Sequence, residues 1–302
     1  MEERFIAWEA RDGAGWVYFS RPGKLNALTQ GALRELWGCL NALETDPAVR
    51  AVVFTGRGTA FCAGMDMAGL EKAAPMAARR LSRELQAVTG RIAELSLPTI
   101  AAVNGVAMGA GLEICLACDL ALATPAARFA FAEARLGMLP YGGGTQRLAR
   151  LVGLRHAREM VLAGRVVDAE TAAEWGLVNE VVSEEGLAAR VEEWVKKLSQ
   201  GGKTALYLSK RCLNRSLDLD LERGLELETE SFATCFGSGE PVRGIRRFAG
   251  GGEEPEGREG REGDETRREK THSEGGVLSG GKAAEAEGAE EAEEAEEDEL
   301  FE

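Results

Sequence analysis

Residues 98–124, PTIAAVNGVAMGAGLEICLACDLALAT, place two short apolar segments on either side of a glycine-bearing loop and an apolar helical run. Segments 98–105 and 118–124 are apolar and bounded by turn residues, which is typical of buried strands. In the helical run, Glu113 is the only residue that is charged at neutral pH. The order of strand, helix and strand favours an α/β fold, and a carboxylate inside an apolar run suggests a chemical role.

The flanking sequence continues the same alternation. Residues 15–20 and 51–56 have the apolar, turn-bounded pattern of strands, and residues 29–46 carry apolar side chains at helical spacing after Thr29, a candidate N-cap. Further helices are predicted over 75–95, 145–162, 168–175, 184–199 and, as one long segment, 204–236. The chain is therefore predicted to be an α/β protein whose last quarter is mostly helical.

The charge of the chain is concentrated at one end. The chain has 302 residues, 44% of them hydrophobic, so it can bury a large core in one or two domains. Residues 251–302 contain 20 Asp and Glu against 6 Lys and Arg, which accounts for the net charge of −14. This tail is nearly free of apolar side chains and is predicted to be disordered. A neutral folded part with an acidic tail argues against nucleic-acid binding, which needs a basic face.

The sequence also limits the cellular context and the metal chemistry. No stretch approaches the roughly 20 apolar residues of a membrane span, and the N-terminus lacks a signal sequence, so we expect a cytoplasmic protein with no membrane partner. The six cysteines are scattered, and the only histidines, His156 and His272, do not form a metal-ligand pattern. Cys115 and Cys118, which form a CxxC pair, are interpreted as core cysteines, and no metal site is expected.

Three glycine-bearing loops, 55–70, 104–113 and 129–148, supply candidate binding groups. Glycine lets backbone amides approach a ligand closely, and the first amides of a helix are unpaired donors. Such loops are also ordinary turns, and these match neither the dinucleotide fingerprint nor the P-loop. In the third loop, Glu133 lies between apolar residues ahead of a glycine-rich turn, as a second carboxylate in an apolar context.

Five motifs follow one another along the chain. They are RPGKLNALT (21–29), AFCAGMDM (60–67), AVNGVAMGAGLEICLACDLALA (102–123), FAEARLGMLPYGGGTQRLARLVG (131–153) and AEWGLVNEVV (173–182). Together they resemble the enoyl-CoA hydratase/isomerase family, also called the crotonase family, over residues 1–248. The resemblance implies a crotonase-like spiral of β-β-α units over 1–190 and a helical trimerisation region over 191–250, with 251–302 as the acidic tail.

The resemblance also implies roles for four residues. The backbone amides of Met65 and Ala110 would form an oxyanion hole for the thioester oxygen. Glu113 would activate a water molecule for attack at C3, and Glu133 would deliver a proton to C2. An apolar wall raises the pKa of a carboxyl group toward the range of an acid or base, and a neighbouring carboxylate raises it further. A role as an acid or base would therefore explain why a carboxyl group occurs in the apolar run at position 113.

Contacts with CoA are implied for residues of the same loops. The positions that match are Lys24, Ala63, Gly64, Asp66, Met67, Gly109 and Tyr141. Asp66 has a second interpretation, as the N-cap of a following helix. Many hydratases of the family have Gly at position 141, so Tyr141 is a departure that would alter water positioning or the acyl pocket. Ala68 and the segment PVRGIRRFAGGGEEP also lack the basic residues expected near the CoA phosphates.

The function implied is reversible hydration of a 2-trans-enoyl-CoA to a 3-hydroxyacyl-CoA. An enoyl-CoA isomerase of the same fold remains an alternative, because isomerisation needs one carboxylate rather than two. A non-catalytic acyl-CoA-binding relative is a further alternative. CoA is part of the substrate, so no cofactor is expected. The resemblance implies a homotrimer or homohexamer, and an acyl-CoA thioester is the expected small-molecule partner.

Overall fold

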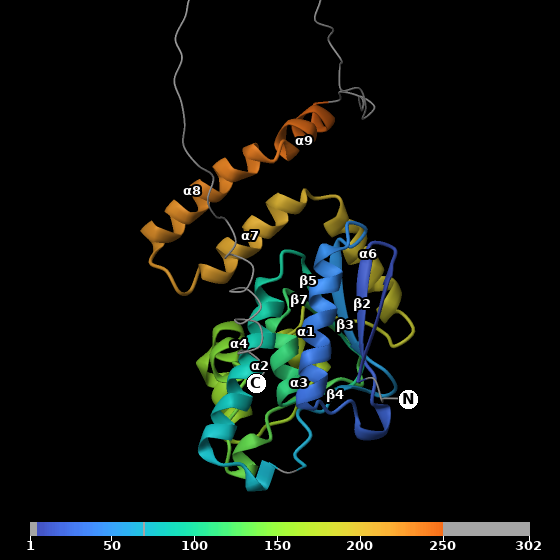
Figure 1. The fold of residues 1–302 in the computed structure, drawn as a ribbon, viewed down its shortest axis with the longest axis vertical. Helices are drawn as coiled ribbons and strands as arrows, with labels where there is room; N and C mark the ends of the chain where they lie inside the picture. Colours follow the sequence, from blue (N-terminus) through green and yellow to red (C-terminus); the bar gives the residue numbers. More distant parts are fainter. Residues whose placement is uncertain (1–4, 69, 250–302) are drawn as a thin grey trace, which may run out of the picture. The chain divides into compact units, whose positions relative to one another are not determined.

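A computed structural model describes residues 5–68 and 70–249 of the chain (Figure 1). Its larger sheet has six strands in the order β1-β2-β3-β5-β7-β10, and all neighbours are parallel except the antiparallel pair β1 and β2. The strands are β1 (Ile6–Arg11), β2 (Ala14–Phe19), β3 (Ala51–Gly56), β5 (Thr99–Val103), β7 (Leu120–Ala123) and β10 (Glu180–Val181). The four strands predicted from the sequence are confirmed as β2, β3, β5 and β7.

A smaller sheet has four short strands in the order β4-β6-β8-β9. They are β4 (Ala60–Cys62), β6 (Val106–Met108), β8 (Arg128–Ala130) and β9 (Val167–Asp168). Strands β3 and β4 are followed by α2 (Pro75–Glu94), β5 and β6 by α3 (Ala110–Ala117), and β7 and β8 by α4 (Gly144–Leu162). Each β-β-α unit thus adds one strand to each sheet, and the predicted spiral of such units is confirmed.

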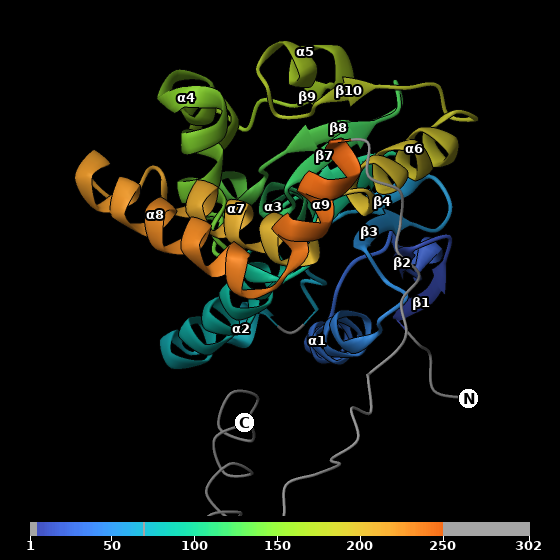
Figure 2. The same ribbon diagram turned by 90° about the horizontal axis from the view of Figure 1, so that it is seen from above.

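The larger sheet is covered on both faces, as parallel sheets usually are. Side chains alternate along β3: Val52 and Phe54 join the core under α1 (Gln30–Thr45), α2 and α3, whereas Ala51 and Val53 join the core under α6 (Leu187–Ser199). Figure 2 shows α1 and α6 on opposite sides of the sheet. The predicted N-cap of α1 is confirmed, because the Thr29 hydroxyl accepts a hydrogen bond from the Ala32 amide at 3.1 Å.

The helical end of the chain differs from the prediction. Residues 204–236 form two helices, α7 (Lys203–Arg215) and α8 (Leu221–Gly237), rather than one. The break falls where Asp220 caps α8 by accepting a hydrogen bond from the Arg223 amide at 3.0 Å. Helix α4 is likewise interrupted, at Gly153, whose φ of 78° is left-handed.

The remaining elements are short. They are the 3-10 turns η1 (Pro22–Lys24), η2 (Leu70–Lys72) and η3 (Glu133–Leu136), and the helices α5 (Ala169–Glu174) and α9 (Glu240–Phe248). One compact unit extends to Arg243 and a second begins at Gly244. The predicted boundary at residue 190 stays a prediction, and the tail predicted to be disordered, 251–302, lies outside the described residues. No helix within 5–68 and 70–249 has the length and apolar character needed to cross a membrane.

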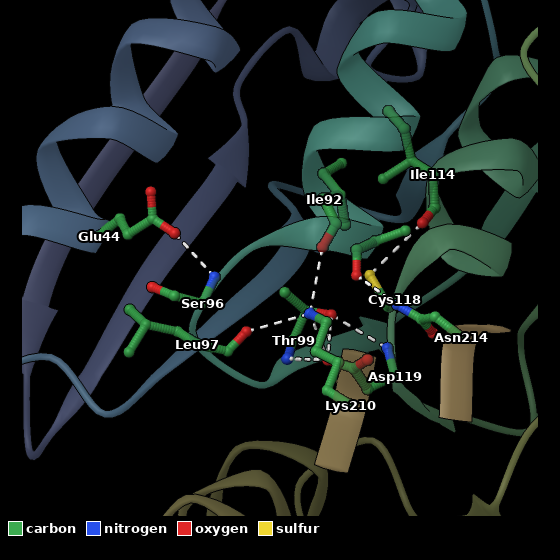
Figure 3. A network of polar contacts seen from close by, with 11 residues as sticks. Glu44, Ile92, Ser96, Leu97, Thr99, Ile114, Cys118, Asp119, Lys210 and Asn214 are labelled. Atoms are coloured by element: carbon green, nitrogen blue, oxygen red, sulfur yellow. Dashed lines mark hydrogen bonds and ion pairs between the residues drawn. The ribbon is translucent and has the colours of Figure 1, made fainter. Parts of the chain in front are cut away.

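A buried lysine of α7, Lys210, holds this helix against the end of α2 and the segments that precede β5 and β7 (Figure 3). The Lys210 ammonium is 2.8 Å from the Asp119 carboxylate and donates to the carbonyl oxygens of Ile92 and Leu97. The same carboxylate oxygen of Asp119 accepts hydrogen bonds from the amide and hydroxyl of Thr99. Lys210 is 8% exposed, so these partners must replace the water that would otherwise solvate its charge.

We expect Asp119→Ala to lower the free energy of unfolding by about 3 kcal/mol, because it leaves a buried ammonium without its counterion. Urea unfolding of the variant and the wild type measures the change. Arg215→Met is the matched control, since Arg215 is on the same helix but its ion pair with Glu94 is half exposed. Exposed pairs contribute about 0–1 kcal/mol. Equal destabilisation by both changes would contradict the role of the buried pair.

Candidate active site

Glu113 lies in the first turn of α3 and is 1% exposed. Its Oε1 atom accepts two backbone hydrogen bonds, from the Gly142 amide at 2.7 Å and from the Gly144 amide at 2.8 Å. These donors come from the glycine-rich turn before α4, which is 29 and 31 residues further along the chain. The carboxylate is therefore held by one oxygen in a fixed orientation.

Only glycine fits at the positions that surround this carboxylate. A Cβ atom at Gly142 would lie 2.6 Å from Glu113 Oε2 and 2.6 Å from Leu85 Cγ. At Gly144, a Cβ atom would lie 2.6 Å from Phe131 Cζ and 3.0 Å from Glu113 Oε1. The glycines of this turn thus allow the backbone to approach the carboxyl group directly.

Glu133 begins η3 and is 6% exposed. A Cβ atom built at Gly109 would lie 2.7 Å from Glu133 Oε1, so this carboxyl group lies against the residue that precedes α3. The Oε2 atoms of Glu113 and Glu133 are both buried, and neither has a hydrogen-bond partner within the described residues. A buried carboxyl oxygen without a partner is costly unless a proton, water or ligand serves it. The structure thus brings the two predicted glutamates into one apolar environment.

The environment changes the acidity of both groups. Burial raises the pKa of Glu113 from its ordinary 4.5 to about 7; the amides of Gly144 and Gly142 oppose this effect, and the charge of Glu133 adds to it. Burial also raises the pKa of Glu133, against a smaller opposite effect of nearby backbone amides. A carboxyl group with a pKa near neutrality, as Glu113 has, exchanges protons readily at physiological pH. The geometry and acidity of the pair are therefore suited to acid–base chemistry.

Because of this raised pKa, the effect of Glu113 on the free energy of unfolding should depend on pH. A carboxyl group with a higher pKa in the folded than in the unfolded protein stabilises the fold below about pH 4.5, and this contribution is lost as the pH rises through about 7. Glu113→Gln should therefore match the wild type near pH 4 and exceed its stability by up to about 3 kcal/mol near pH 8. Urea unfolding at both pH values tests this. A constant difference between the two proteins would refute the raised pKa.

Two backbone amides, those of Met65 and Ala110, lie in loops that meet at Gly64 and Gly109. Met65 forms an isolated parallel bridge with Leu28, in which the Leu28 amide donates to Gly64 O and the Asp66 amide donates to Leu28 O. In this arrangement the Met65 N–H is directed away from Leu28. Ala110 begins α3, so its N–H has no acceptor within the helix. Neither amide donates a hydrogen bond to any residue within the described ranges.

The two loops that carry these amides are in contact. Gly64 has a φ of +99°, and a Cβ atom on it would lie 2.9 Å from Met108 O and 3.4 Å from the Ala110 nitrogen. Gly64 therefore permits the approach of the first glycine-bearing loop to the start of α3. The structure thus brings together the loop of Met65, the amide of Ala110 and the carboxyl group of Glu133, through Gly109 between them.

Four of the residues predicted to contact CoA, Lys24, Ala63, Asp66 and Met67, lie in the two segments joined by the Leu28–Met65 bridge. The Ala63 amide donates to Leu25 O at 2.9 Å, which holds the segment of Lys24 beside the first glycine-bearing loop. Lys24 and Met67 are exposed, and Ala63 is half-buried. Asp66 pairs with Arg21 at 2.7 Å and accepts from the Ala68 amide at 3.1 Å. The carboxylate thus stabilises a local turn and does not cap a helix, because the next element, η2, begins only at Leu70.

Tyr141 lies beside the glutamate pair. Its carbonyl oxygen accepts hydrogen bonds from the Ser82 hydroxyl at 2.9 Å and the Gln86 side-chain amide at 3.0 Å, both from α2. Burial, together with the charges of Glu113 and Glu133, raises the pKa of the Tyr141 phenol to about 12. The phenol therefore stays protonated near two carboxyl groups, where it occupies space and offers a donor.

The cysteines take no part in this site. Cys39, Cys62 and Cys115 are buried, and all six cysteines are free. Burial raises the pKa of the Cys62 and Cys115 thiols to about 12, so they are not nucleophilic at neutral pH. Across the described residues, no group of His, Cys, Asp and Glu side chains has the arrangement of a metal site. The interpretation of Cys115 as a core cysteine is confirmed, and Cys118 is partly buried and packs against the same core.

The sequence did not indicate the residues that hold the glutamates. Gly142 and Gly144 belong to a run of glycines that could equally be a simple turn, and Thr89 and Arg147 lie inside amphipathic helices. The Thr89 hydroxyl and the Arg147 guanidinium both donate to Gly142 O. No pattern in the sequence distinguishes these two polar residues from other residues of their helices.

The known proteins that this chain resembles in sequence and in structure point to one family. Residues 9–254 match the family model described as enoyl-CoA hydratase/isomerase. A crotonyl-CoA hydratase of Syntrophomonas wolfei is 35% identical over 244 residues, which cover 80% of this chain and 94% of that protein. A short-chain-enoyl-CoA hydratase of Clostridium acetobutylicum is 36% identical, covering 78% of this chain and 91% of that protein. The crystal structure of an enoyl-CoA hydratase from Bacillus anthracis has a TM-score of 0.78 at 30% identity, covering 82% and 96% of the two chains.

Proposed function

Because this chain belongs to the enoyl-CoA hydratase/isomerase family, we propose that it catalyses the reversible hydration of a 2-trans-enoyl-CoA to a 3-hydroxyacyl-CoA. The observation that carries the proposal is the pair of buried carboxyl groups, Glu113 and Glu133, each with an oxygen atom that no described residue serves. Hydration needs a base for water at C3 and an acid for C2, and two such groups divide these roles. CoA enters as part of the substrate, and the proposal requires no cofactor.

The amides of Met65 and Ala110 are proposed to bind the thioester oxygen. They carry no other hydrogen bond within the described chain, and their loops touch at Gly64. Negative charge that develops on this oxygen as the enolate forms would meet two N–H donors and the positive end of the α3 dipole. Donors held in place before the reaction lower its barrier, typically by about 3–4 kcal/mol each.

The two glutamates are proposed to move the protons. Glu113, in its ionised form, accepts a proton from water while the water oxygen bonds to C3 and the C2–C3 π electrons move toward the thioester oxygen. Collapse of the enolate then takes a proton from Glu133 to C2. These steps leave Glu113 protonated and Glu133 ionised, and proton exchange restores the starting state. A pKa of about 7 for Glu113 makes the ionised form available at neutral pH.

Incubation of the purified protein with crotonyl-CoA tests the proposal. We expect loss of the absorbance of the conjugated thioester and formation of 3-hydroxybutyryl-CoA. A 3-enoyl-CoA separates the alternative, because an isomerase of the same fold would convert this substrate and leave crotonyl-CoA unhydrated. Binding of CoA esters without turnover of either substrate would identify a non-catalytic relative.

Lys24, Ala63, Asp66 and Met67 are proposed to line the CoA path, and a homotrimer or homohexamer is proposed as the working form. The support for association is an apolar surface on α8, where Leu221, Leu225 and Phe232 are 78%, 52% and 66% exposed. Exposed apolar side chains that recur along a helix commonly mark an interface. Light scattering measures the assembly, and a monomer would contradict this part of the proposal.

A further inference from the structure

Arg147, in the first turns of α4, lies directly under the turn that holds Glu113. Its Nη1 atom donates to Gly142 O at 3.2 Å and to the Thr89 hydroxyl at 3.1 Å. The Thr89 hydroxyl, which is fully buried, donates in turn to Gly142 O at 2.7 Å. A Cβ atom at Gly143, whose φ is +108°, would lie 2.2 Å from Arg147 Nη1. Glycine at this position is therefore what allows the guanidinium to pack against the turn.

The peptide groups of this turn connect Arg147 to the carboxylate. The carbonyl oxygen of Gly142 faces the guanidinium and Thr89, while the amides of Gly142 and Gly144 face Glu113 Oε1. The neighbouring Tyr141 carbonyl is held by Ser82 and Gln86, which belong to α2 like Thr89. The position of the Glu113 carboxylate is thus set by a turn that is itself fixed from two helices.

Arg147 differs from the other arginines of its helix, Arg150, Arg155 and Arg158, because those three are exposed. It is partly buried and has no carboxylate within ion-pair distance among the described residues. Burial lowers its pKa, and the charge of Glu113 is the largest effect that opposes this. Arg150, one turn further along α4, instead pairs with Asp218 at 3.2 Å on the surface.

We propose that Arg147 is a positioning residue for Glu113: through the Gly142–Gly144 turn it fixes the carboxylate, and its positive charge favours the ionised form of that carboxylate. This inference rests on the proposed hydration, in which Glu113 is the base. The charged or titratable groups that face Glu113 are Glu133 from η3, Arg147 from α4 and the phenol of Tyr141. The α2 side chain at the carboxylate is the apolar Leu85, and the β4 side chain against α3 is the neutral thiol of Cys62.

Arg147 is the one group in this set whose positive charge opposes the effects of burial and of Glu133 on Glu113. Arg147→Met removes both the charge and the hydrogen bonds at similar volume. Arg147→Lys keeps the charge but cannot reproduce the planar donors that reach both Thr89 and Gly142. The two substitutions therefore separate electrostatics from positioning.

The experiment measures kcat and KM for crotonyl-CoA across pH, and the titration of the Glu113 carboxyl carbon by ¹³C NMR in the free protein. We expect Arg147→Met to lower kcat by about 100-fold with little change in KM, since small displacements of a catalytic group have such effects. Its ascending pH limb and the Glu113 titration should both move to higher pH. Arg147→Lys should keep the titration near that of the wild type but still lose kcat.

Arg150→Met is the matched control and should resemble the wild type in every measurement. The inference is overturned if folded Arg147→Met keeps the wild-type kcat and Glu113 titration, or if it only loses stability while its pH profile is unchanged. If Arg147→Met fails to fold, Thr89→Val tests the same turn with the charge retained, and a wild-type kcat there would overturn the positioning role. A wild type that does not hydrate crotonyl-CoA would refute the proposed function instead, while the NMR titration still decides whether Arg147 acts on Glu113.

Discussion

Glu113→Gln should lower kcat for the hydration of crotonyl-CoA by about 10²–10⁴-fold, the range that a general base supplies. The glutamine carbonyl can still accept the hydrogen bonds of the Gly142 and Gly144 amides, so the fold of the site is preserved. What is lost is the group that accepts the proton of water. KM should change little, because the side chain acts on water rather than on CoA. Steady-state kinetics near pH 8, where the wild-type carboxylate is ionised, measures the effect.

Glu133→Gln should also lower kcat by about 10²–10⁴-fold, because an amide cannot donate the proton that C2 requires. Glu174→Gln is the control, since Glu174 ends α5 and is exposed. The double variant should be little worse than either single one, as expected for groups that act in one reaction. Retention of wild-type hydration by either single variant would remove that residue from the mechanism.

The sequence predicted four of the six strands of the larger sheet, β2, β3, β5 and β7, but no strand of the smaller sheet. Strands such as β3 and β5 are apolar runs of five or six residues, and their pattern is visible without any partner. Strands β4, β6 and β8 have only three residues each, too few to show an alternation. They exist because the neighbouring units of the spiral bring their backbones together, and this information is not local.

The prediction of the site had a similar limit. Glu113 stood out because a charge within an apolar helix has a large desolvation cost. The groups that offset this cost, the amides of Gly142 and Gly144, are distant in sequence and have no side chains that could indicate their role.

The break between α7 and α8 was missed for a different reason. No Gly or Pro lies in residues 216–220. Asp220 could equally lie inside a helix with its side chain in solvent, and the sequence does not show that it caps α8 instead.

The contact between the two amide-bearing loops gives the second large prediction. Gly64→Ala should lower kcat by about 10²–10³-fold, the effect of losing one oxyanion donor. The new methyl group would lie 2.9 Å from Met108 O and 3.4 Å from the Ala110 nitrogen, so the loops must separate and the distance between the Met65 and Ala110 amides must change. Glu113 and Glu133 remain in place, and their titration should be unaffected.

The substitution also strains the backbone, because φ at Gly64 is +99°. Gly176→Ala separates strain from displacement: its φ is +74°, but a Cβ atom there meets no atom within 4 Å. Both variants should lose roughly 1–2 kcal/mol of stability from the left-handed conformation, whereas only Gly64→Ala should lose kcat. Equal loss of kcat in both would mean that instability causes the defect. Unchanged kcat in folded Gly64→Ala would mean that the Met65 and Ala110 amides do not bind the thioester oxygen together.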